Sequence, residues 1–207
     1  IAKFMNKLLI ATTNKGKLKE FQEFLSDLPI ELVSLTDVGI DADFEEKGNS
    51  YSENSEGKAR FYANLSGLPA LADDGGIEIS ALNNEPGTRS RRWLGHEATD
   101  EELIEHMKKI SRELPEDNRT AYFKTVVTVA FPNGSILQEK GEVKGEIARK
   151  PFLKLSKGYP YRSFFFLPDI NKYYHEADLS EGETREYNHR YKAVNKLKPE
   201  LIKEFEL

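Results

Sequence analysis

The sequence predicts an α/β fold, and two patterns in the chain support this prediction. Residues 7–35 give the order strand, turn, helix and strand, which is typical of an α/β fold. Residues about 119–170 look more antiparallel, so we expect them to form much of a second lobe. The 207 residues are enough for one generous domain, spanning 1–207, with a buried core.

The first part of the chain predicts two strands around a helix. Residues 7–12 form an apolar run that enters a polar turn, as a buried strand does. Residues 18–28 carry apolar side chains at helical spacing, and residues 30–35 predict a second strand. An acidic loop follows at residues 41–50.

A second helix and a third strand come after this loop. The helix covers residues 52–68 and has Gly67 near its end. Residues 69–74 predict a strand that stops at paired aspartates and glycines. Residues 76–82 continue it briefly.

The remainder predicts a helix, a hairpin and a final helix. Residues 100–114 predict a helix with Thr99 as N-cap and a capping-box glutamate three residues later. Residues 119–131 and 135–148 surround a Pro-Asn-Gly turn, which predicts a hairpin whose first strand is half-buried. The last helix begins near residue 188 and runs for about fifteen residues.

Composition excludes several classes of protein. A net charge of −5 argues against bulk nucleic-acid binding, although a local group of lysines can still bind a small anion. The absence of cysteine excludes disulfides, thiolate chemistry and cysteine-type zinc sites. No run approaches the ~20 apolar residues of a membrane helix, and no signal peptide is evident. We therefore expect a cytoplasmic protein without a membrane partner, and Met5 is a candidate for its natural start.

The polar turn at residues 12–17 is a candidate phosphate site. It lies before a helix N-terminus, where backbone amides attract anions. It adds hydroxyl and amide groups, a glycine that lets a ligand approach, and two positive charges: Thr12, Thr13, Asn14, Lys15, Gly16 and Lys17. The pattern differs from the Walker A loop. The alternative is an ordinary polar turn capped by Asn14.

Paired carboxylates suggest a metal site. Asp73 and Asp74 lie at the expected strand end, where ligands bind in open α/β sheets, and Glu45 and Glu46 lie in a loop that can approach the same edge. Clustered carboxylates repel unless a cation lies among them, and Mg²⁺ suits carboxylates combined with phosphate oxygens. The alternative is that Asp73 caps a turn and Asp74 is solvated.

Three cationic or titratable residues are further candidates. Lys58 lies within the second helix and is either part of a solvent face or a second phosphate-binding lysine. His189 and Arg190 stand at the start of the last helix, where they could bind an anion or the edge of a flat base. The alternative for this pair is an ordinary surface position.

The order of these motifs resembles the inosine/xanthosine triphosphate pyrophosphatase family, whose house-cleaning enzymes remove deaminated purine nucleotides. The segments that carry the resemblance are "ATTNKGKLKE", "EEKGNSYSENSEGKAR", "ALADDGGIEISAL", "PGTRSRRWLG", "GYPYRSFFFLPD" and "NHRYKA". The resemblance covers about residues 7–197, and the segments include the T-x-N-x-x-K, A-D-D-x-G and P-G-x-x-S-x-R elements.

The resemblance implies a fold, a reaction and partners. The fold would have two lobes and a long central mixed sheet flanked by helices, with a nucleotide cleft between the lobes. The reaction would be the Mg²⁺-dependent hydrolysis of a nucleoside triphosphate to the monophosphate and pyrophosphate, with Mn²⁺ as another candidate metal. The protein would be a homodimer.

The resemblance also assigns residues to roles. Asp74 falls on the metal-binding general base, with Asp73 beside it. Glu45 or Glu46 falls on a metal ligand, and the alternative for Glu46 is a position behind the ligands. Tyr159 falls on the aromatic residue that stacks on the base. The remaining assignments are the triphosphate-binding residues Thr12, Thr13, Asn14, Lys17 and Lys58 and the base-reading pair His189 and Arg190. Further candidates for substrate contact, which the family pattern does not assign, are Gly75, Tyr161 and Arg162.

The base pocket departs from the family pattern G-F-G-[YW]-D-P. This chain has Gly158-Tyr159-Pro160-Tyr161-Arg162-Ser163, so a guanidinium at Arg162 replaces an acceptor carboxylate. The serine that follows the aspartates is Gly75, and the serine of S-H-R is Asn188. We therefore predict an altered or relaxed base preference. Two alternatives stay open: a pyrophosphatase for pyrimidine or modified nucleotides, and a catalytically silent nucleotide-binding protein.

Overall fold

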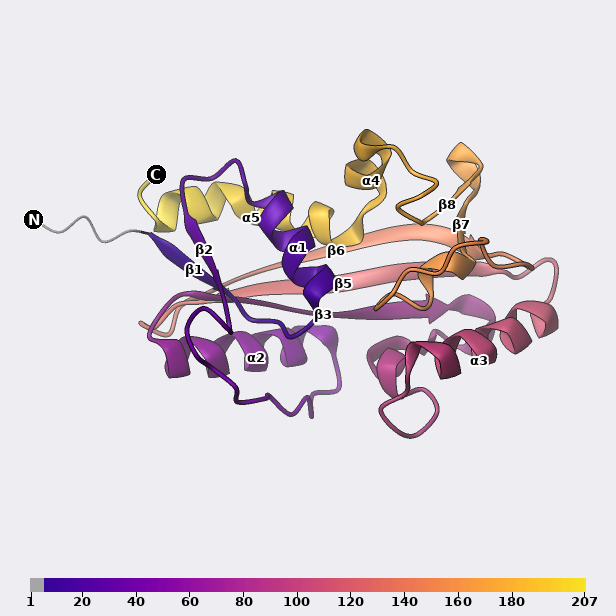
Figure 1. Ribbon diagram of the computed structural model, residues 1–207, viewed down its shortest axis with the longest axis horizontal. Coiled ribbons are helices and arrows are strands. Elements are labelled where there is room, and N and C mark those ends of the chain that lie inside the picture. Colours follow the sequence, from indigo (N-terminus) through magenta and orange to yellow (C-terminus); the bar gives the residue numbers. More distant parts are fainter. Residues whose placement is uncertain (1–5) are drawn as a thin grey trace, which may run out of the picture. The chain divides into compact units, whose positions relative to one another are not determined.

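The computed structural model describes residues 6–207, so the candidate start at Met5 lies outside the described residues. Within them, eight strands form one sheet in the order β2-β1-β3-β5-β6-β7-β8, with β4 paired to β3 (Figure 1). The strands are β1 (Lys7–Ile10), β2 (Glu31–Ser34), β3 (Ala70–Ile79), β4 (Glu85–Pro86), β5 (Thr120–Ala130), β6 (Ile136–Ile147), β7 (Phe165–Leu167) and β8 (Lys172–Tyr173). The α-helices are α1 (Lys15–Phe24), α2 (Tyr51–Ser66), α3 (Asp100–Glu113), α4 (Glu181–Tyr187) and α5 (His189–Glu204).

The expected α/β fold with a long mixed sheet flanked by helices is confirmed. The chain divides into two compact units. The first comprises the residues up to Asp74, Thr125–Gly141 and Arg190–Leu207, and the second comprises Gly75–Lys124 and Glu142–His189. The predicted cleft between two lobes stays a prediction.

The first unit begins with parallel strands. β1 pairs with β2 in the register Lys7↔Glu31 to Ile10↔Ser34, and helix α1 connects them, as a parallel pair requires. β1 also pairs with β3, through Leu9↔Ala70 and Ile10↔Leu71. The predicted strand–helix–strand start is therefore confirmed.

Helices cover both faces of this part of the sheet. Successive strand residues point to opposite faces, so neighbouring residues contact different helices. Leu8, Ile10 and Leu71 pack with residues of α1 and α5. Leu9 and Ala70 pack with residues of α2 on the other face. This alternation decides which helix each later residue of β3 meets.

The prediction that the third strand stops at the aspartates was wrong. β3 continues through Gly75 and Gly76 to Ile79, because glycine can adopt extended backbone and the strand pairs onward with β4. The pairing with β1 nevertheless ends at Ile10↔Leu71. Asp73 and Asp74 therefore lie just beyond the carboxyl end of β1, although they are in the middle of their own strand.

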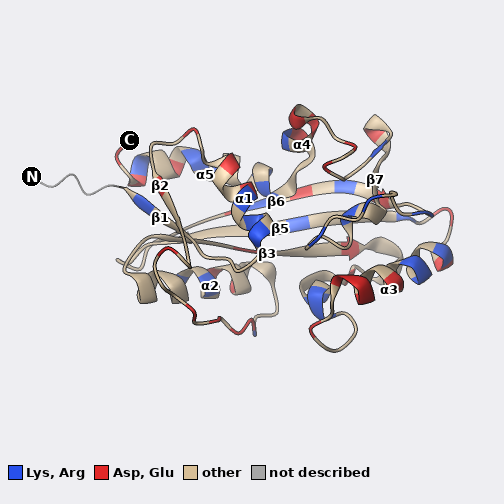
Figure 2. Ribbon diagram, in the orientation of Figure 1, with Lys and Arg blue, Asp and Glu red and all other residues tan. Residues whose placement is uncertain are grey.

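The second unit has its own core around helix α3. Leu103, Ile104 and Met107 of α3 pack with Ile77 and with other residues of this unit, including Phe123, Val143, Phe164 and Tyr174. The helix has the predicted capping box of Thr99 and Glu102. Acidic residues lie in its first turn and Arg112 in its last, which suits the helix dipole (Figure 2).

The predicted hairpin is confirmed, with a correction to its burial. Phe131 and Ser135 close the turn between β5 and β6 by a backbone hydrogen bond of 3.0 Å. β5 is half-buried only as far as Lys124, and every residue from Thr125 to Ala130 is buried. In the first unit, helices cover both faces of the sheet, so side chains on both sides of this segment are buried. Among the described residues, no helix is long and apolar enough to cross a membrane.

Replacing the N-cap of α3 should destabilise the protein. Thr99→Ala removes the acceptor for the Glu102 backbone N–H, so we expect a loss of about 1 kcal/mol in the free energy of unfolding, measured by urea denaturation. Thr99→Ser keeps the acceptor and serves as the control. Equal losses in the two variants would contradict the role of the cap.

Candidate active site

Two adjacent aspartates of β3 are buried in the first unit. Asp73 is 2% exposed and Asp74 is 7% exposed. They point to opposite faces of the strand. Asp73 contacts Lys17 of α1, whereas Asp74 contacts Asn54 of α2. The pleat thus divides the candidate site into two connected halves.

Asp73 is the anchor of an ion cluster. Its Oδ2 accepts from Lys17 Nζ at 3.0 Å and from Arg190 Nε at 2.9 Å, and Thr125 Oγ1 lies at 3.4 Å. Arg190 also pairs with Glu20 at 3.2 Å. Burial alone would raise the pKa of Asp73, but Lys17 and Arg190 outweigh it and hold the pKa well below its usual range. Asp73 therefore stays ionised as a counter-ion.

Lys17 is held by this carboxylate with its side chain 19% exposed. Burial lowers its pKa, and Asp73 opposes that effect. The result is a partly exposed ammonium group fixed beside the aspartates.

Asp74 has the opposite electrostatic environment. Burial and the charge of Glu46 raise its pKa to about 6, and the hydrogen bond from Asn54 only partly opposes them. Glu46 pairs with Lys58 of α2. Burial would lower the pKa of Lys58, but Glu46 outweighs it, so the net shift is upward. This half of the site holds two carboxylates around one lysine.

The two candidate glutamates of the acidic loop behave differently. Glu46 is brought to Asp74, whereas the side chain of Glu45 is 74% exposed and pairs with Lys47 at 2.8 Å. No group of three histidine, cysteine, aspartate or glutamate residues gathers to hold a metal in the part of the chain from residue 6 onward. Asp74 and Glu46 are the two neighbouring carboxylates that a metal could use here.

These residues fit Mg²⁺. The charge of Glu46 raises the pKa of Asp74, so the two carboxylates are close enough to repel, and a shared cation would relieve that repulsion. Mg²⁺ commonly uses one or two carboxylates together with phosphate oxygens and water. The two carboxylates would supply the protein part of such a ligand set.

The turn before α1 is an asparagine-capped turn. Asn14 Oδ1 accepts the backbone N–H groups of Gly16 at 2.9 Å and Lys17 at 3.1 Å, and Thr12 Oγ1 accepts that of Asn14 at 3.2 Å. This is the geometry of the alternative considered for this turn. The phosphate-binding roles of Thr12, Thr13 and Asn14 stay predictions.

The predicted base-pocket residues surround an aromatic cluster in the second unit. The guanidinium of buried Arg162 lies 3.8 Å from the ring centroid of Tyr159 and 5.0 Å from that of Tyr174. Tyr161 is also buried, and its hydroxyl donates to the carbonyl of Ser90. Tyr161 thus joins two loops, while its contact with substrate stays a prediction.

His189 and Arg190 are both buried, so the surface alternative for this pair was wrong. The ring of His189 lies parallel to that of Phe123, with centroids 5.3 Å apart, and its Nδ1 is 2.9 Å from the Tyr174 hydroxyl. Arg190 instead meets the carboxylates Asp73 and Glu20. The predicted role of the pair in reading a purine edge stays a prediction.

Three residues of the site were missed by sequence reasoning: Asn54, Thr125 and Glu20. Asn54 precedes Lys58 by four residues, which places both on one face of α2. That spacing was a usable signal for Asn54. The candidate residue Gly75 lies within β3, and its predicted contact with substrate is not tested by the fold.

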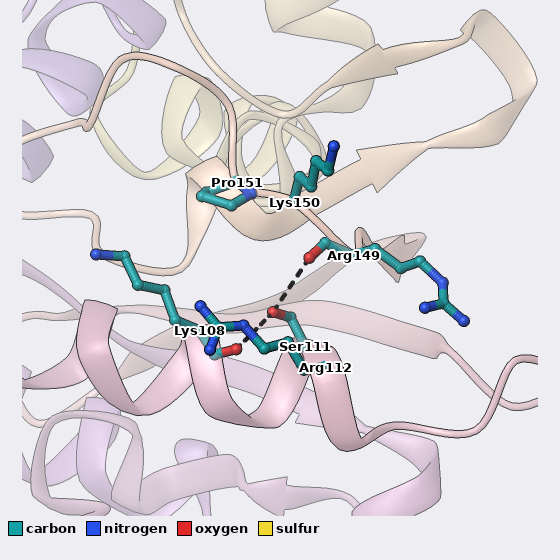
Figure 3. A pocket seen from close by; sticks show the side chains of 6 residues that line it. All are labelled: Lys108, Ser111, Arg112, Arg149, Lys150 and Pro151. Carbon is teal, nitrogen blue, oxygen red and sulfur yellow. Dashed lines mark hydrogen bonds between the residues drawn. The ribbon is translucent and has the colours of Figure 1, made fainter.

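A separate cavity of 420 Å³ lies in the second unit and has a basic lining (Figure 3). Lys108 and Arg112 project from α3, opposite Lys150 and Pro151. Two of its four cations are already paired, Lys108 with Glu105 and Arg149 with Glu116. The cavity is therefore less cationic than its lining suggests.

Comparison with known proteins identifies the family. The sequence profile of the Ham1 family matches residues 8–200. This chain belongs to the Ham1 family. A relative named dITP/XTP pyrophosphatase from Desulfotalea psychrophila is 37% identical over 95% of this chain and 86% of its own length. One of the same name from Haemophilus influenzae is 37% identical over 94% of this chain and 98% of its own.

Solved structures agree with the Ham1 assignment. A HAM1 protein from Coxiella burnetii has a TM-score of 0.81 and 35% identity, covering 96% of this Ham1 chain and all of its own. A nucleoside-triphosphatase, or dITP/XTP pyrophosphatase, from Mycobacterium abscessus has a TM-score of 0.70 and 32% identity, with coverage of 92% and 98%. The predicted family resemblance is confirmed.

Removing the charge of Asp73 should destabilise the fold. Asp73→Asn leaves Lys17 and Arg190 without their buried counter-ion, so we expect a loss of about 3–5 kcal/mol in urea unfolding. Asp27→Asn breaks the pair between Lys198 and an aspartate whose side chain is 63% exposed, and it is the control, expected to cost about 1 kcal/mol or less. Similar losses would contradict the anchoring role of Asp73.

Asp74 should give metal-free protein a distinct pH dependence. Its pKa is about 6 in the folded state against 3.8 normally, so its contribution to stability is complete below pH 4 and is lost as the pH rises through 6. The shift corresponds to roughly 3 kcal/mol. Between pH 4 and pH 7.5 we expect the free energy of unfolding of Asp74→Asn to rise by about this amount relative to that of wild type. The measurement is urea unfolding in EDTA. A pH-independent difference would contradict the raised pKa.

Proposed function

We propose that this protein hydrolyses non-standard purine nucleoside triphosphates, such as ITP, XTP and dITP, to the monophosphate and pyrophosphate with Mg²⁺. The observation that carries the proposal is the arrangement of charged residues around the two adjacent aspartates of β3. Asp73 fixes Lys17, and Asp74 lies with Glu46 and Lys58. The names of the relatives, dITP/XTP pyrophosphatase, support the same substrate class.

The cationic side chains would bind the triphosphate. Hydrolysis at the α-phosphorus develops charge on phosphate oxygens, and Lys17 and Lys58 supply fixed positive charge beside the aspartates. Thr12, Thr13, Asn14 and Gly75 are proposed to contact the same phosphates. Mg²⁺, held by Asp74 and Glu46, would neutralise phosphate charge and lower the pKa of a coordinated water. Mn²⁺ is the alternative metal.

Asp74 is proposed as the general base. Its pKa of about 6 in the metal-free protein lies close to neutral pH, where a carboxylate is both ionised and able to accept a proton from water. Asp73 cannot share this role, because its low pKa makes it a poor proton acceptor. The two adjacent aspartates thus have different functions that their environments impose.

Base recognition is proposed to involve Tyr159, Tyr161, Arg162, His189 and Arg190, with an altered or relaxed preference. The guanidinium of Arg162 stacks on Tyr159 and presents hydrogen-bond donors. Donors favour bases with exposed acceptor oxygens or nitrogens. This feature also supports the second candidate function, hydrolysis of pyrimidine or modified nucleoside triphosphates. We also propose a cytoplasmic homodimer, as the resemblance implies.

Pyrophosphate release from a panel of triphosphates tests the proposal. With Mg²⁺ we expect turnover of inosine, xanthosine or modified triphosphates, and Asp74→Asn should lower kcat by roughly 10²–10⁴. Asp41→Asn, an exposed aspartate of the same loop as Glu46, is the control and should retain activity.

The results of the panel distinguish the proposed function from its alternatives. Nucleotide binding without pyrophosphate release, in wild type as well as in Asp74→Asn, would overturn the proposal in favour of a silent binding protein. A sharp preference for ITP would contradict the altered base preference. Turnover restricted to pyrimidine or modified triphosphates would favour the second candidate function.

A further inference from the structure

Asn54 is a polar side chain in a buried position. It is 1% exposed, so both ends of its amide need hydrogen-bond partners. Its Nδ2 donates to Asp74 Oδ2 at 2.9 Å, and its Oδ1 accepts the backbone N–H of Gly48 at 2.7 Å. These partners fix the direction of the amide, because the exchanged orientation would set an oxygen against a carboxylate.

The contact with Gly48 requires glycine. A Cβ at this position would lie 2.6 Å from Asn54 Oδ1 and 2.9 Å from the Cβ of Glu53. The acidic loop can therefore reach the amide only because residue 48 has no side chain. The close approach to the Cβ of Glu53 shows that the backbone at Gly48 lies against the first turn of α2.

The loop is attached to α2 at a second point. Glu46, two residues before Gly48, pairs with Lys58, which lies one turn beyond Asn54 on the same helix face. Lys58 sets the position of the Glu46 side chain, and Asn54 sets the backbone behind it. Asn54 also holds the Asp74 carboxylate, so a single amide connects Asp74 with the loop backbone two residues after Glu46.

Resting on the function proposed above, we propose that Asn54 is a positioning residue that sets the separation of Glu46 and Asp74 for a shared divalent cation. The hydrogen bond uses one of about four lone-pair positions on the carboxylate, so it orients Asp74 without blocking it as a ligand. Partners that orient metal ligands in this way typically change metal affinity or activity by about 10–100-fold when removed.

The first experiment replaces the amide. Asn54→Ala should raise the Mg²⁺ concentration for half-maximal pyrophosphate release by about 10–100-fold, while kcat at saturating Mg²⁺ falls much less. Asn64→Ala, an exposed asparagine of the same helix, is the matched control and should not change either value. A loss of kcat with unchanged Mg²⁺ dependence would overturn the positioning role.

The second experiment leaves Asn54 in place and displaces the loop. Gly48→Ala adds the clashing Cβ and should lower the affinity for the metal, as Asn54→Ala does. Gly182→Ala adds a Cβ in open space and should leave the affinity unchanged. Calorimetric titration of Mn²⁺ into each protein supplies a readout that needs no turnover. Wild-type affinity in both Gly48→Ala and Asn54→Ala would overturn the inference. Absence of pyrophosphate release by wild type would instead count against the proposed function alone.

Discussion

The alternation of side chains along β3 is the constraint on which the candidate site depends. Residues 71 and 73 face α1 and α5, and residues 70, 72 and 74 face α2. Two consecutive aspartates are therefore delivered to different helices without any bend in the backbone. The pairing between β1 and β3 ends at Ile10↔Leu71, so β1 does not extend alongside the two aspartates. Residues near helix termini and in a loop contact the aspartate side chains there.

The two aspartates differ in how fully their burial is compensated. Removing an ion from water is costly, and the cost is recovered only when counter-charges and hydrogen bonds are well placed. Asp73 has Lys17 and Arg190 and is fully compensated. Asp74 has a neutral amide and lies beside the negative Glu46, so its ionised form is disfavoured in the metal-free state. The ionised form is thus favoured at Asp73 and disfavoured at Asp74.

The sequence was sufficient for the architecture. Helical and strand periodicities located the elements, and the capping box at Thr99 and the end of α2 at Gly67 were predicted correctly. The assignment of Lys17, Lys58 and Asp74 to one region required the family resemblance, because no local pattern joins residues so distant in the chain. Gly75 and Gly76 misled the strand boundary, since glycine is compatible with both a turn and an extended strand.

Other features of the site were beyond sequence reasoning for physical reasons. Glu45 and Glu46 lie in an irregular loop without periodicity, so nothing in the sequence distinguishes the buried side chain from the exposed one. The pairing of Arg190 with Asp73 joins residues 117 positions apart. The proposed role of Asn54 depends on the approach of the loop to its amide, and that approach is a property of the folded chain.

The capped turn before α1 has a consequence for selectivity. Asn14 already engages the amides of Gly16 and Lys17, so a polyphosphate at this place would be bound mainly by the side-chain ammonium groups of Lys17 and Lys58. Ammonium groups attract negative charge with little regard for its geometry, unlike a rigid ring of backbone donors. Such a grip treats all triphosphate tails nearly alike. In the proposed function, discrimination between nucleotides would then depend on the base-recognition residues around Arg162.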